Sequence, residues 1–505
     1  MGRTPWSARV PLDPHLEYRA RLQQADVGVG RGPGGPPHRA HTSFSAGSTN
    51  PLCHVVYTDH FRMSSTQPHL RRALTLWDLI LYGVIVLQPV APMSVFGVIS
   101  DRGHGHVVTT LLLAMVGMLI TAFSYGRMAR AYPSAGSAFT YVGQEINPAL
   151  GYITGWSMVM DYMLNPLICI RWCSEAASAF APEVRPWMWA IVIFFLFTGL
   201  NLRGVKTSAR VNAGLATGMG LVVLAFFVAA ARYIFGNPHD GFAFFTRPFY
   251  DPATFNIGAV MGGTSIAVLT YIGFDGISTL SEEVENPRRN ILLATVLTCL
   301  VIGVLSAMEC YAGQLVWPAS QPFPNSDTAF VDVAKRTLVP LGWITAVTLI
   351  VANFGSGMAA QFGAARLLYG MGRSNALPAK FFGAVEPKRG IPRNNVIFVG
   401  VIALVGAFLI PYSLGAEMLN FGALIAFMGV NASVIMHYYV RAKEKKLSNF
   451  ILPLLGFLVC LLLWINLSRP AQILGGVWML VGIAFGAWKT KGFRGNLIDF
   501  NLPPE

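Results

Sequence analysis

Long apolar stretches recur from Leu74 onward and are separated by short polar or proline-rich segments. Each stretch has about twenty residues, the length that an α-helix needs to cross a hydrocarbon layer of roughly 30 Å. The stretches begin near Leu76, Val107, Gly151, Trp187, Val211, Phe255, Ile291, Leu341, Val396, Met418, Ile451 and Ile473. The pattern therefore predicts an all-α integral membrane protein with about twelve transmembrane helices.

Two of these stretches are interrupted by residues that weaken a helix. The first contains Gln88-Pro89 followed by Pro92, and the sixth contains Gly273 and Gly276. A backbone break inside a bilayer leaves amides and carbonyls unpaired, which costs several kcal/mol per group unless they face a cavity. Breaks at matching places in two halves of a chain are typical of secondary transporters, whose solute site lies between them. A kink from glycine packing alone is the alternative at the second break.

The predicted helices fall into two sets of five between Leu74 and about residue 440. Because each set has an odd number of helices, the second set enters the membrane from the opposite side and inverts the first. We therefore expect a transporter core at 63–440, with a 5+5 inverted repeat and discontinuous helices 1 and 6. Helices eleven and twelve and the cytoplasmic C-terminus fill 441–505, as peripheral packing or a dimer surface.

Composition and charge pattern both place the chain in a membrane. Hydrophobic residues make up 53% of the chain and charged residues 12%, with a mean hydropathy of +0.51. The net charge is +13, and Lys and Arg gather in alternate loops: before the first helix and after the second, fourth, eighth, tenth and last helices. Such loops mark the cytoplasmic side, so they predict a multi-pass inner-membrane protein with both termini in the cytoplasm. The same distribution argues against nucleic-acid binding.

The first 62 residues carry Gly, Pro, Arg and His without helical periodicity. They lack the apolar core that a signal peptide requires, and their composition is typical of disordered segments. Met63 opens a compact polar lead into the first helix. An over-long start assignment for the coding sequence is therefore the alternative to a disordered tail at 1–62.

Two acidic residues fall inside predicted membrane helices, where a charge costs about 2.5 to 3.5 kcal/mol. Asp161 lies in the third helix, before Tyr162, and needs a partner: a substrate ammonium, a transferable proton, or a hydrogen bond from a Tyr or Asn. Asp275 lies in the second break, where it could hold an amine, carry a proton or cap the inner half-helix. Both carboxylates are therefore candidates for substrate binding and for proton coupling.

The remaining polar groups favour structural interpretations. Arg171 and Glu175 lie one helical turn apart in the third helix, and Glu309 lies at similar depth in the seventh. Their arrangement allows an outer gate or a structural ion pair. The six cysteines are scattered, which favours packing over a disulfide framework. No metal site or cofactor is predicted, and no nucleophile, base and orienting group can be placed together, so we do not expect an enzyme.

Several residue strings carry a resemblance to a known family. They are Ser124–Arg127 with Tyr132–Tyr141, Gly273–Gly276 followed by Ser281–Pro287, and Ala365–Arg373. Over nearly all of Leu74 to Arg494 the chain resembles the amino acid, polyamine and organocation transporter superfamily. Within it, the strings Gln88-Pro89, Asp161-Tyr162, Gly273–Ser278 and Asn420–Leu424 resemble putrescine importers most closely.

The resemblance implies an inverted repeat of five plus five helices, with the substrate between the first and sixth. Substrate contacts are then assigned to Gln88, Pro89, Asp161, Tyr162, Tyr271, Gly273, Phe274 and Asp275. It also implies a closing network at the cytoplasmic mouth, from Glu282, Glu283 and Arg288, for which a solvated charge run is the alternative.

The residues at the expected ion site differ from those that the family uses to bind sodium or to replace it with a lysine. Some proton-driven relatives carry a lysine in the fifth helix where other members bind sodium, and Met219 takes that place here. The eighth helix offers Ser356 but no set of hydroxyls for a tight sodium site. Protons moved by Asp161 or Asp275, or exchange against another solute, are the remaining candidates.

These observations lead to one main hypothesis and two alternatives. The first is a secondary active transporter that imports a small amine-bearing solute, putrescine or a related polyamine, by alternating access. A diamine would neutralise both buried carboxylates, whereas a neutral zwitterion would leave at least one without a partner. An amino acid permease is the runner-up, and a nutrient sensor that binds without transporting is the alternative of another class. The expected partners are the amine or amino acid, a proton and the lipid bilayer; oligomeric state stays open.

Overall fold

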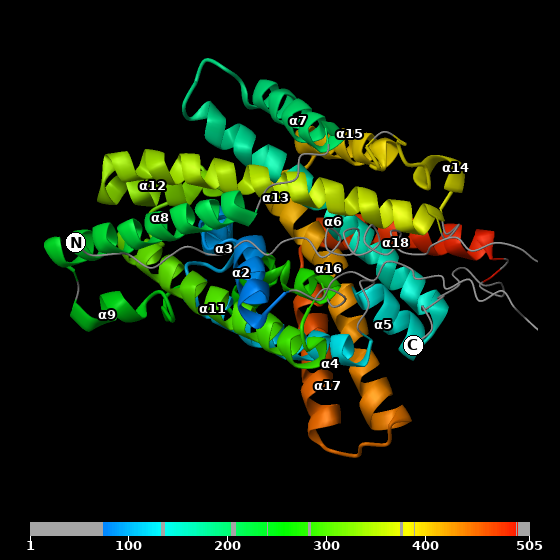
Figure 1. Ribbon diagram of the computed structural model, residues 1–505. Helices are drawn as coiled ribbons and strands as arrows, with labels where there is room; N and C mark the ends of the chain where they lie inside the picture. The colour runs from blue at the N-terminus through cyan, green and yellow to red at the C-terminus, as the bar shows by residue number, and fades with distance from the viewer. Residues whose placement is uncertain are drawn as a thin grey trace, which may run out of the picture. The chain divides into compact units, whose positions relative to one another are not determined.

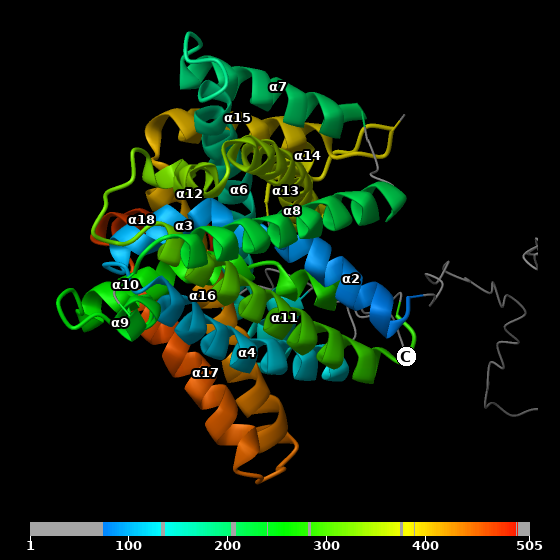
Figure 2. The ribbon, with the colours of Figure 1, turned by 90° about the vertical axis from the view of Figure 1, so that its left-hand side faces the viewer.

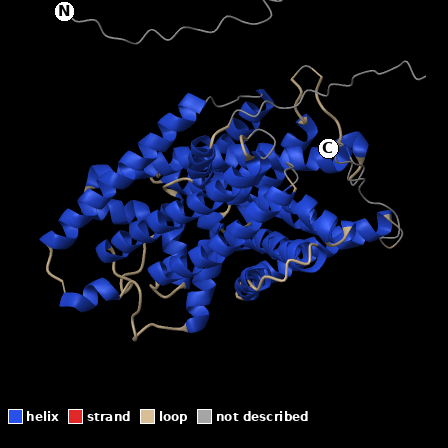
Figure 3. Ribbon diagram, turned by 60° about the horizontal axis from the view of Figure 1, so that its bottom comes forward, coloured by secondary structure: helices blue, strands red, loops and turns tan. Residues whose placement is uncertain are grey.

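Helices joined by loops make up the described part of the chain (Figure 3). Within it, β-type backbone pairing is limited to two isolated bridges. The computed structural model describes residues 74–132, 137–203, 209–239, 241–280, 284–373, 377–387, 389–490 and 492. The segment 1–62 and the gate candidates Glu282 and Glu283 lie outside these residues. The all-α prediction is confirmed.

The first five spans begin with a helix in two halves. Their elements are α2 (Leu76–Leu87) with α3 (Ala91–Arg102), α4 (Val107–Ala131), α6 (Pro148–Ser178), α7 (Pro186–Arg203) and α8 (Ala209–Gly236). A short helix, α5 (Ser137–Glu145), lies between the second and third spans. α9 (Gly241–Thr246) leads into the second repeat.

The second five spans repeat this order. They are α10 (Ile257–Ala267) with the 3-10 helices η1 (Val268–Tyr271) and η2 (Phe274–Leu280), α11 (Pro287–Val316), α13 (Val339–Arg373), α15 (Arg393–Leu409), and α16 (Tyr412–Val434) with the π-helix η4 (Ile435–Arg441). The connections contain η3 (Ser326–Thr328), α12 (Ala329–Thr337) and α14 (Ala379–Phe382), and α17 (Ser448–Ile465) and α18 (Arg469–Lys489) follow.

The number of spans agrees with the sequence prediction. By length and composition, 9 of the described helices can cross a membrane, and the α2–α3 pair, bent by 46°, makes a tenth. α6 has 31 residues but carries several polar side chains, and α15 is apolar with 17 residues. With these two helices the described part of the chain reaches the predicted twelve.

The outward faces of the peripheral helices are apolar. α7 and α15 pack together at one edge, and α17 lies at the opposite edge, with α2, α3 and α16 between them (Figures 1 and 2). Large apolar side chains such as Phe195, Leu221 and Leu480 are exposed on α7, α8 and α18. Contiguous exposed apolar surface of this kind is covered by lipid in a membrane protein.

Equivalent helices of the two halves pack against each other. α4 lies along α11, and α6 lies along α13, so the second and third spans of each half are paired. Between these spans each half also has a nine-residue helix, α5 in the first and α12 in the second. This correspondence agrees with the inverted repeat.

The last helix is fastened to the third span by two tryptophans. Trp156 of α6 and Trp478 of α18 stack with ring centroids 4.8 Å apart. Each indole nitrogen donates to the other residue's carbonyl oxygen, at 2.8 and 3.1 Å. A Cβ on Gly482 would lie 2.2 Å from the Trp156 ring, so only glycine lets the helices approach this closely.

The first break follows from the residues at 88–92. Gln88 ends α2 with a positive φ of 59°, and Pro89 and Pro92 cannot donate the amide hydrogen bonds of a continuous helix. The Gln88 side-chain nitrogen Nε2 donates to the carbonyl of Ala352 in α13 at 2.8 Å. The break is therefore tied to the eighth span.

The second break begins where α10 tightens into η1. Ile272 is extended, and Gly273 has a φ of +120°, which an L-residue rarely adopts. The Asn420 side chain of α16 donates to the carbonyls of Ser265 and Ile266 at 2.7 and 3.3 Å. A side chain of the tenth span therefore satisfies backbone acceptors near the end of α10.

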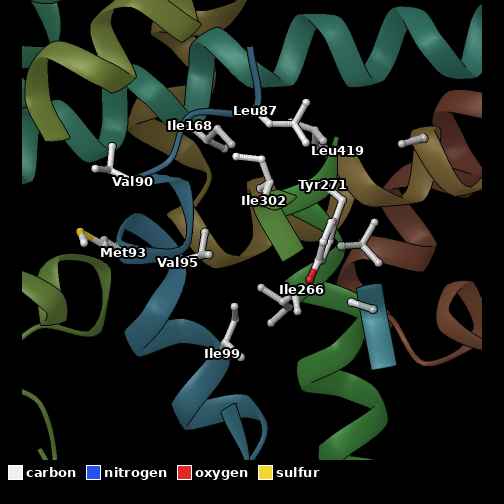
Figure 4. Packing of buried hydrophobic residues seen from close by; sticks show 14 of the residues in the cluster. Leu87, Val90, Met93, Val95, Ile99, Ile168, Ile266, Tyr271, Ile302 and Leu419 are labelled. Carbon is white, nitrogen blue, oxygen red and sulfur yellow. The ribbon is translucent and has the colours of Figure 1, made fainter. Parts of the chain in front are cut away.

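The two breaks touch. A Cβ on Gly273 would lie 3.0 Å from Val86 Cγ1 at the end of α2. Figure 4 shows Leu87 and Val90 flanking the first break, in the same buried cluster as Tyr271 of the second break and Ile302 of α11. The predicted discontinuities in helices 1 and 6 are therefore present and adjacent.

Replacing Gly273 by alanine is expected to destabilise the protein by about 1–3 kcal/mol, because the side chain would be forced into a strained backbone conformation. Gly276→Ala is the control, since its Cβ would meet only the Tyr82 hydroxyl at 3.9 Å. The measurement is the apparent midpoint of thermal unfolding of purified protein in detergent. Equal midpoints for the two variants would contradict a strained role for Gly273.

Candidate functional site

Two buried carboxylates lie beside the paired breaks. Asp161 of α6 is 8% exposed and Asp275 of η2 is 5% exposed. The two side chains interact electrostatically with each other, and Tyr162 interacts with both. Three of the predicted site residues, on two different spans, are therefore brought together.

Among the described residues, neither carboxylate has a cationic partner. Asp161 makes no ion pair or hydrogen bond with its side chain in this part of the chain, so a bond from a Tyr or Asn, one of the three alternatives for its partner, is not found there. The Asp275 carboxylate lies near the backbone amides of Gly273, Asp275 and Gly276. That contact agrees with the capping interpretation and leaves the charge itself unneutralised.

Glycines allow the surrounding helices to approach the two carboxylates. A Cβ on Gly422 of α16 would lie 2.5 Å from the Ser157 carbonyl and 3.4 Å from the Asp161 amide nitrogen. On α13, a Cβ on Gly363 would lie 3.2 Å from the Tyr162 ring. The third, eighth and tenth spans thus meet at the level of Asp161.

Phe274, another predicted contact residue, belongs to an aromatic cluster from four elements. Its ring lies 5.4 Å from Tyr125 of α4 and 5.2 Å from Phe427 of α16, between centroids. Tyr125 also packs edge to face against Tyr141 of α5 at 6.3 Å. These four fully or nearly fully buried rings fill the space between η2, α4, α5 and α16.

The other predicted contact residues have partners of their own. The Tyr271 hydroxyl donates to the Leu111 carbonyl of α4 at 2.9 Å, which fixes the second break to the second span. Gln88 is held by Ala352, as described above, and Pro89 forms the turn between α2 and α3. These three residues shape the breaks, whereas Asp161, Tyr162 and Asp275 supply the charges and hydroxyl.

At the end of the bundle where α11 begins, which the charge pattern predicts to be cytoplasmic, basic residues line a cavity. The cavity has a volume of about 500 Å³, and Arg130, Arg288 and Arg289 lie around it. Arg288 is exposed at the start of α11. The rest of the predicted gate, Glu282 and Glu283, is outside the described residues.

A second charged network at the same end was not found from the sequence. Glu145, fully buried at the end of α5, lies 2.5 Å from His437 Nδ1 and 3.3 Å from Arg441 Nη1, both in η4. Tyr132 donates its hydroxyl to Glu145 at 2.5 Å, and burial together with this bond raises the pKa of Tyr132 to about 12. Since the partners are distant in sequence, no local pattern indicated this network.

The opposite end, predicted to face outward, contains an acidic cavity of about 550 Å³. Asp101 and Arg102 of α3, Asp327 of η3 and Glu417 of α16 lie around it. The Glu417 carboxylate accepts a hydrogen bond from the Ser468 amide at 2.6 Å. Burial raises the pKa of Asp327 from 3.8 to about 6, although Arg171 opposes the shift.

The candidate outer ion pair forms only in part. Arg171 Nη2 lies 2.8 Å from Glu175 Oε1, one turn away on the half-exposed face of α6. Glu309 is fully buried on α11 and has no ion pair among the described residues. The structural pair within α6 is therefore present, and Glu309 does not join it.

The geometry agrees with one family of known proteins. A family model described as amino acid permease matches residues 79–492. The chain belongs to this family. The permease is 35% identical over 440 residues to the low-affinity putrescine importer PlaP of Escherichia coli K12, covering 85% of this chain and 96% of that protein.

Two relatives of lower identity are named for solutes other than putrescine. The branched-chain amino acid permease BcaP of Bacillus subtilis is 25% identical over 455 residues, covering 84% of this chain and 94% of the relative. The vacuolar cationic amino acid transporter 4 of Arabidopsis thaliana is 25% identical over 406 residues, covering 76% and 66%. The resemblance seen in the sequence is confirmed, and the permease is a multi-pass membrane transporter with the inverted-repeat fold.

Replacing Asp327 by asparagine is expected to stabilise the permease at neutral pH, because the fold disfavours the charged carboxylate, whose pKa is raised to about 6. This destabilising contribution is complete above pH 6, declines between pH 6 and 3.8, and is absent below. After allowance for screening, the gain is about 1–3 kcal/mol at pH 7.5.

The measurement compares apparent thermal midpoints of wild-type protein and Asp327→Asn at pH 7.5 and pH 4.5. The midpoint of the variant should be higher at pH 7.5, and the difference should shrink at pH 4.5. A variant that is less stable than the wild type at both pH values would show that the charge of Asp327 stabilises the folded permease.

Proposed function

We propose that this permease imports a small amine-bearing solute, with putrescine or a related polyamine as the first choice. The observation that carries the proposal is the pair Asp161 and Asp275, buried next to each other without a described cation between them. A diamine brings two ammonium groups and can neutralise both charges. A zwitterionic amino acid brings one ammonium group and a further carboxylate, so it leaves excess negative charge buried. The likeness to a putrescine importer supports the same choice.

In this proposal the solute lies between the two breaks. Asp275 holds one ammonium group at η2, and Asp161 holds the other from α6. Tyr162, which interacts with both carboxylates, orients them through its hydroxyl. Phe274, next to Asp275, packs its ring in the aromatic cluster with Tyr125 and Phe427 and so closes the chamber on that side. Gln88, Pro89, Tyr271 and Gly273 act by keeping the breaks open.

Proton coupling or exchange is the proposed driving mode. With no amine bound, two like charges this close and this deeply buried cannot both stay ionised, so at least one takes up a proton. Binding of the amine then releases that proton. Ser356, the hydroxyl considered for a sodium site, bonds to Asn165 Oδ1 at 3.5 Å, and Met219 is a buried apolar side chain of α8.

The proposed orientation places the Arg288 end and both termini in the cytoplasm of a cell with this permease in its inner membrane. The acidic cavity at the Asp327 end then receives cationic solute from outside, while the aromatic cluster around Phe274 separates the carboxylates from the cytoplasm. Arg288 would close the inner mouth with Glu282 and Glu283. The proposed domain limits stay at 1–62, 63–440 and 441–505.

Uptake of labelled putrescine into proteoliposomes, with a competition panel of polyamines and amino acids, tests the proposal. Saturable uptake blocked by polyamines and not by neutral amino acids is expected. Competition by branched-chain or cationic amino acids alone would favour the amino acid permease, which the likeness to BcaP keeps as the second candidate. Binding without uptake would favour a sensor.

Asp275→Asn is expected to reduce putrescine uptake to background, because one ammonium group loses its counter-charge. Asp332→Asn, on the short helix α12 and paired with Lys335 within the described part of the chain, is the control and should transport normally. Both variants should elute as monodisperse protein in detergent. Uptake by Asp275→Asn at the wild-type rate would remove this carboxylate from the mechanism.

Asp161→Asn is expected to change how uptake depends on pH, because it removes one of the two groups that share a proton in the empty transporter. Initial rates from pH 5.5 to 8.5 should vary less in the variant than in the wild type. A variant with lower rates and an unchanged pH profile would return Asp161 to a structural role.

A further inference from the structure

The basic cavity where α4 ends and α11 begins is only partly used by the proposed transport cycle. Arg130 lies in the last turn of α4, and Arg288 and Arg289 lie in the first turn of α11. All three line this cavity of about 500 Å³, and Leu292 and Leu293 complete its described lining. The cavity therefore combines three positive charges with an apolar wall.

The packing of α4 along α11 places these groups together (Figure 2). A Cβ on Gly126 of α4 would lie 2.6 Å from the Leu292 Cα, so only glycine lets the two helices approach this closely. Arg130 follows Gly126 by one helical turn, and Arg288 precedes Leu292 by one turn. The arginines of both helices therefore lie just beyond this contact, at the same end of the bundle.

Within the described part of the chain, the three guanidinium groups have no anionic partner. No ion pair joins Arg130, Arg288 or Arg289 to another described residue, and all three are exposed. In contrast, Arg127 and Arg441, at the same end, are held by hydrogen bonds or ion pairs with protein groups. Like charges gathered around one cavity repel each other, and a bound anion would relieve that repulsion. An anion is therefore the class of ligand that this cavity fits.

An apolar stripe on α11 begins at Leu293 in the cavity and continues toward the other end of the helix. Its exposed side chains recur every three to four residues, as on one face of a helix. They are Leu297, Leu300, Val301, Val304 and Met308. From Leu293 to Met308 the stripe rises about 22 Å. This length exceeds the depth of one hydrocarbon leaflet, roughly 15 Å, so an acyl chain fits along it.

We propose that the cavity binds the headgroup of an anionic phospholipid. Arg130 and Arg289 hold the phosphate diester, and an acyl chain lies along the α11 stripe. Guanidinium groups match phosphate oxygens in paired hydrogen bonds, and basic pockets between transmembrane helices on the cytoplasmic side are suited to anionic headgroups. A soluble phosphate shares the headgroup chemistry but leaves the stripe unused, so the observations favour the lipid.

Bound lipid would hold the end of the second span against the start of the seventh, beside the proposed gate residue Arg288. Because the lipid binds the folded permease at a site that the unfolded chain lacks, it stabilises the fold by an amount that grows with its concentration relative to its dissociation constant. Thermal stability therefore reports occupancy of the site without any measurement of transport.

The test titrates phospholipids of one acyl composition into purified permease in detergent and follows the apparent thermal midpoint. Phosphatidylglycerol should raise the midpoint at a concentration at least about tenfold lower than zwitterionic phosphatidylethanolamine, since one charge-assisted hydrogen bond is worth about that factor. In the double variant Arg130→Gln/Arg289→Gln, the two lipids should act at similar concentrations.

The matched control is the double variant Arg203→Gln/Arg393→Gln. It removes two exposed arginines that the charge pattern places on the same side of the membrane and that do not line this cavity. It should keep the wild-type preference for phosphatidylglycerol.

Three outcomes would overturn the inference. The first is no preference for phosphatidylglycerol in the wild type, and the second is an equal loss of preference in both double variants, which would indicate attraction to overall charge. The third is an equal rise of the midpoint with glycerol 3-phosphate, which would identify a site for soluble phosphate. Detergent exposes both ends of the bundle, so failure of the proposed solute or orientation would not alter these results.

A probe of the wild-type protein covers the case in which the variant does not fold. Phenylglyoxal modifies accessible guanidinium groups, and peptide mass spectrometry measures the extent at each arginine. In phosphatidylglycerol nanodiscs, compared with phosphatidylcholine nanodiscs, Arg130 and Arg289 should be modified more slowly relative to Arg393, which corrects for the charge of the membrane surface. An unchanged ratio would contradict a headgroup bound in the cavity.

Discussion

Two like charges buried side by side, with no described cation between them, are the constraint on which the architecture depends. Asp161 and Asp275 come from different spans, and each is tolerated at this depth only because protons or a bound amine can neutralise it. Two glycines allow the surrounding helices to approach: Gly273 at the second break lets η2 turn against α2, and Gly422 lets α16 approach α6 near Asp161. Two buried carboxylates without a described counter-charge are electrostatically unfavourable, and the dication proposed as substrate would relieve this imbalance.

A side chain links each break to another helix: at the first break Gln88 donates to a backbone carbonyl of α13, and at the second Asn420 of α16 donates to backbone carbonyls near the end of α10. Each bond links a broken span to an unbroken one. Rearrangement during transport has to exchange such bonds for others, so the breaks act as hinges whose resting positions are defined by a few polar contacts.

The sequence was informative where structure is determined locally and much less so where it depends on distant partners. Pro89, Pro92 and Gly273 predicted both breaks because they act on their own backbone, and apolar length predicted the spans. The proline-rich loop before α13 gave no sign of α12, which forms because Phe330 packs against Phe96 and Phe226. Likewise, the contacts of Glu145 with His437 and of Tyr271 with Leu111 join residues far apart in the sequence, which no local pattern indicates. Glu309 was associated with Arg171 by depth alone, which carries no information about helix rotation.

The stacked tryptophans join α18 to α6, the helix that carries Asp161. Because Trp156 and Trp478 exchange hydrogen bonds as well as ring contact, α18 and α6 behave as one rigid unit. α6 carries Asp161, so if this carboxylate lines the solute chamber as proposed, a displacement of the final helix would also displace one wall of that chamber. A fluorophore attached after Lys489 would consequently report the movement of that wall without touching any residue that contacts the cargo.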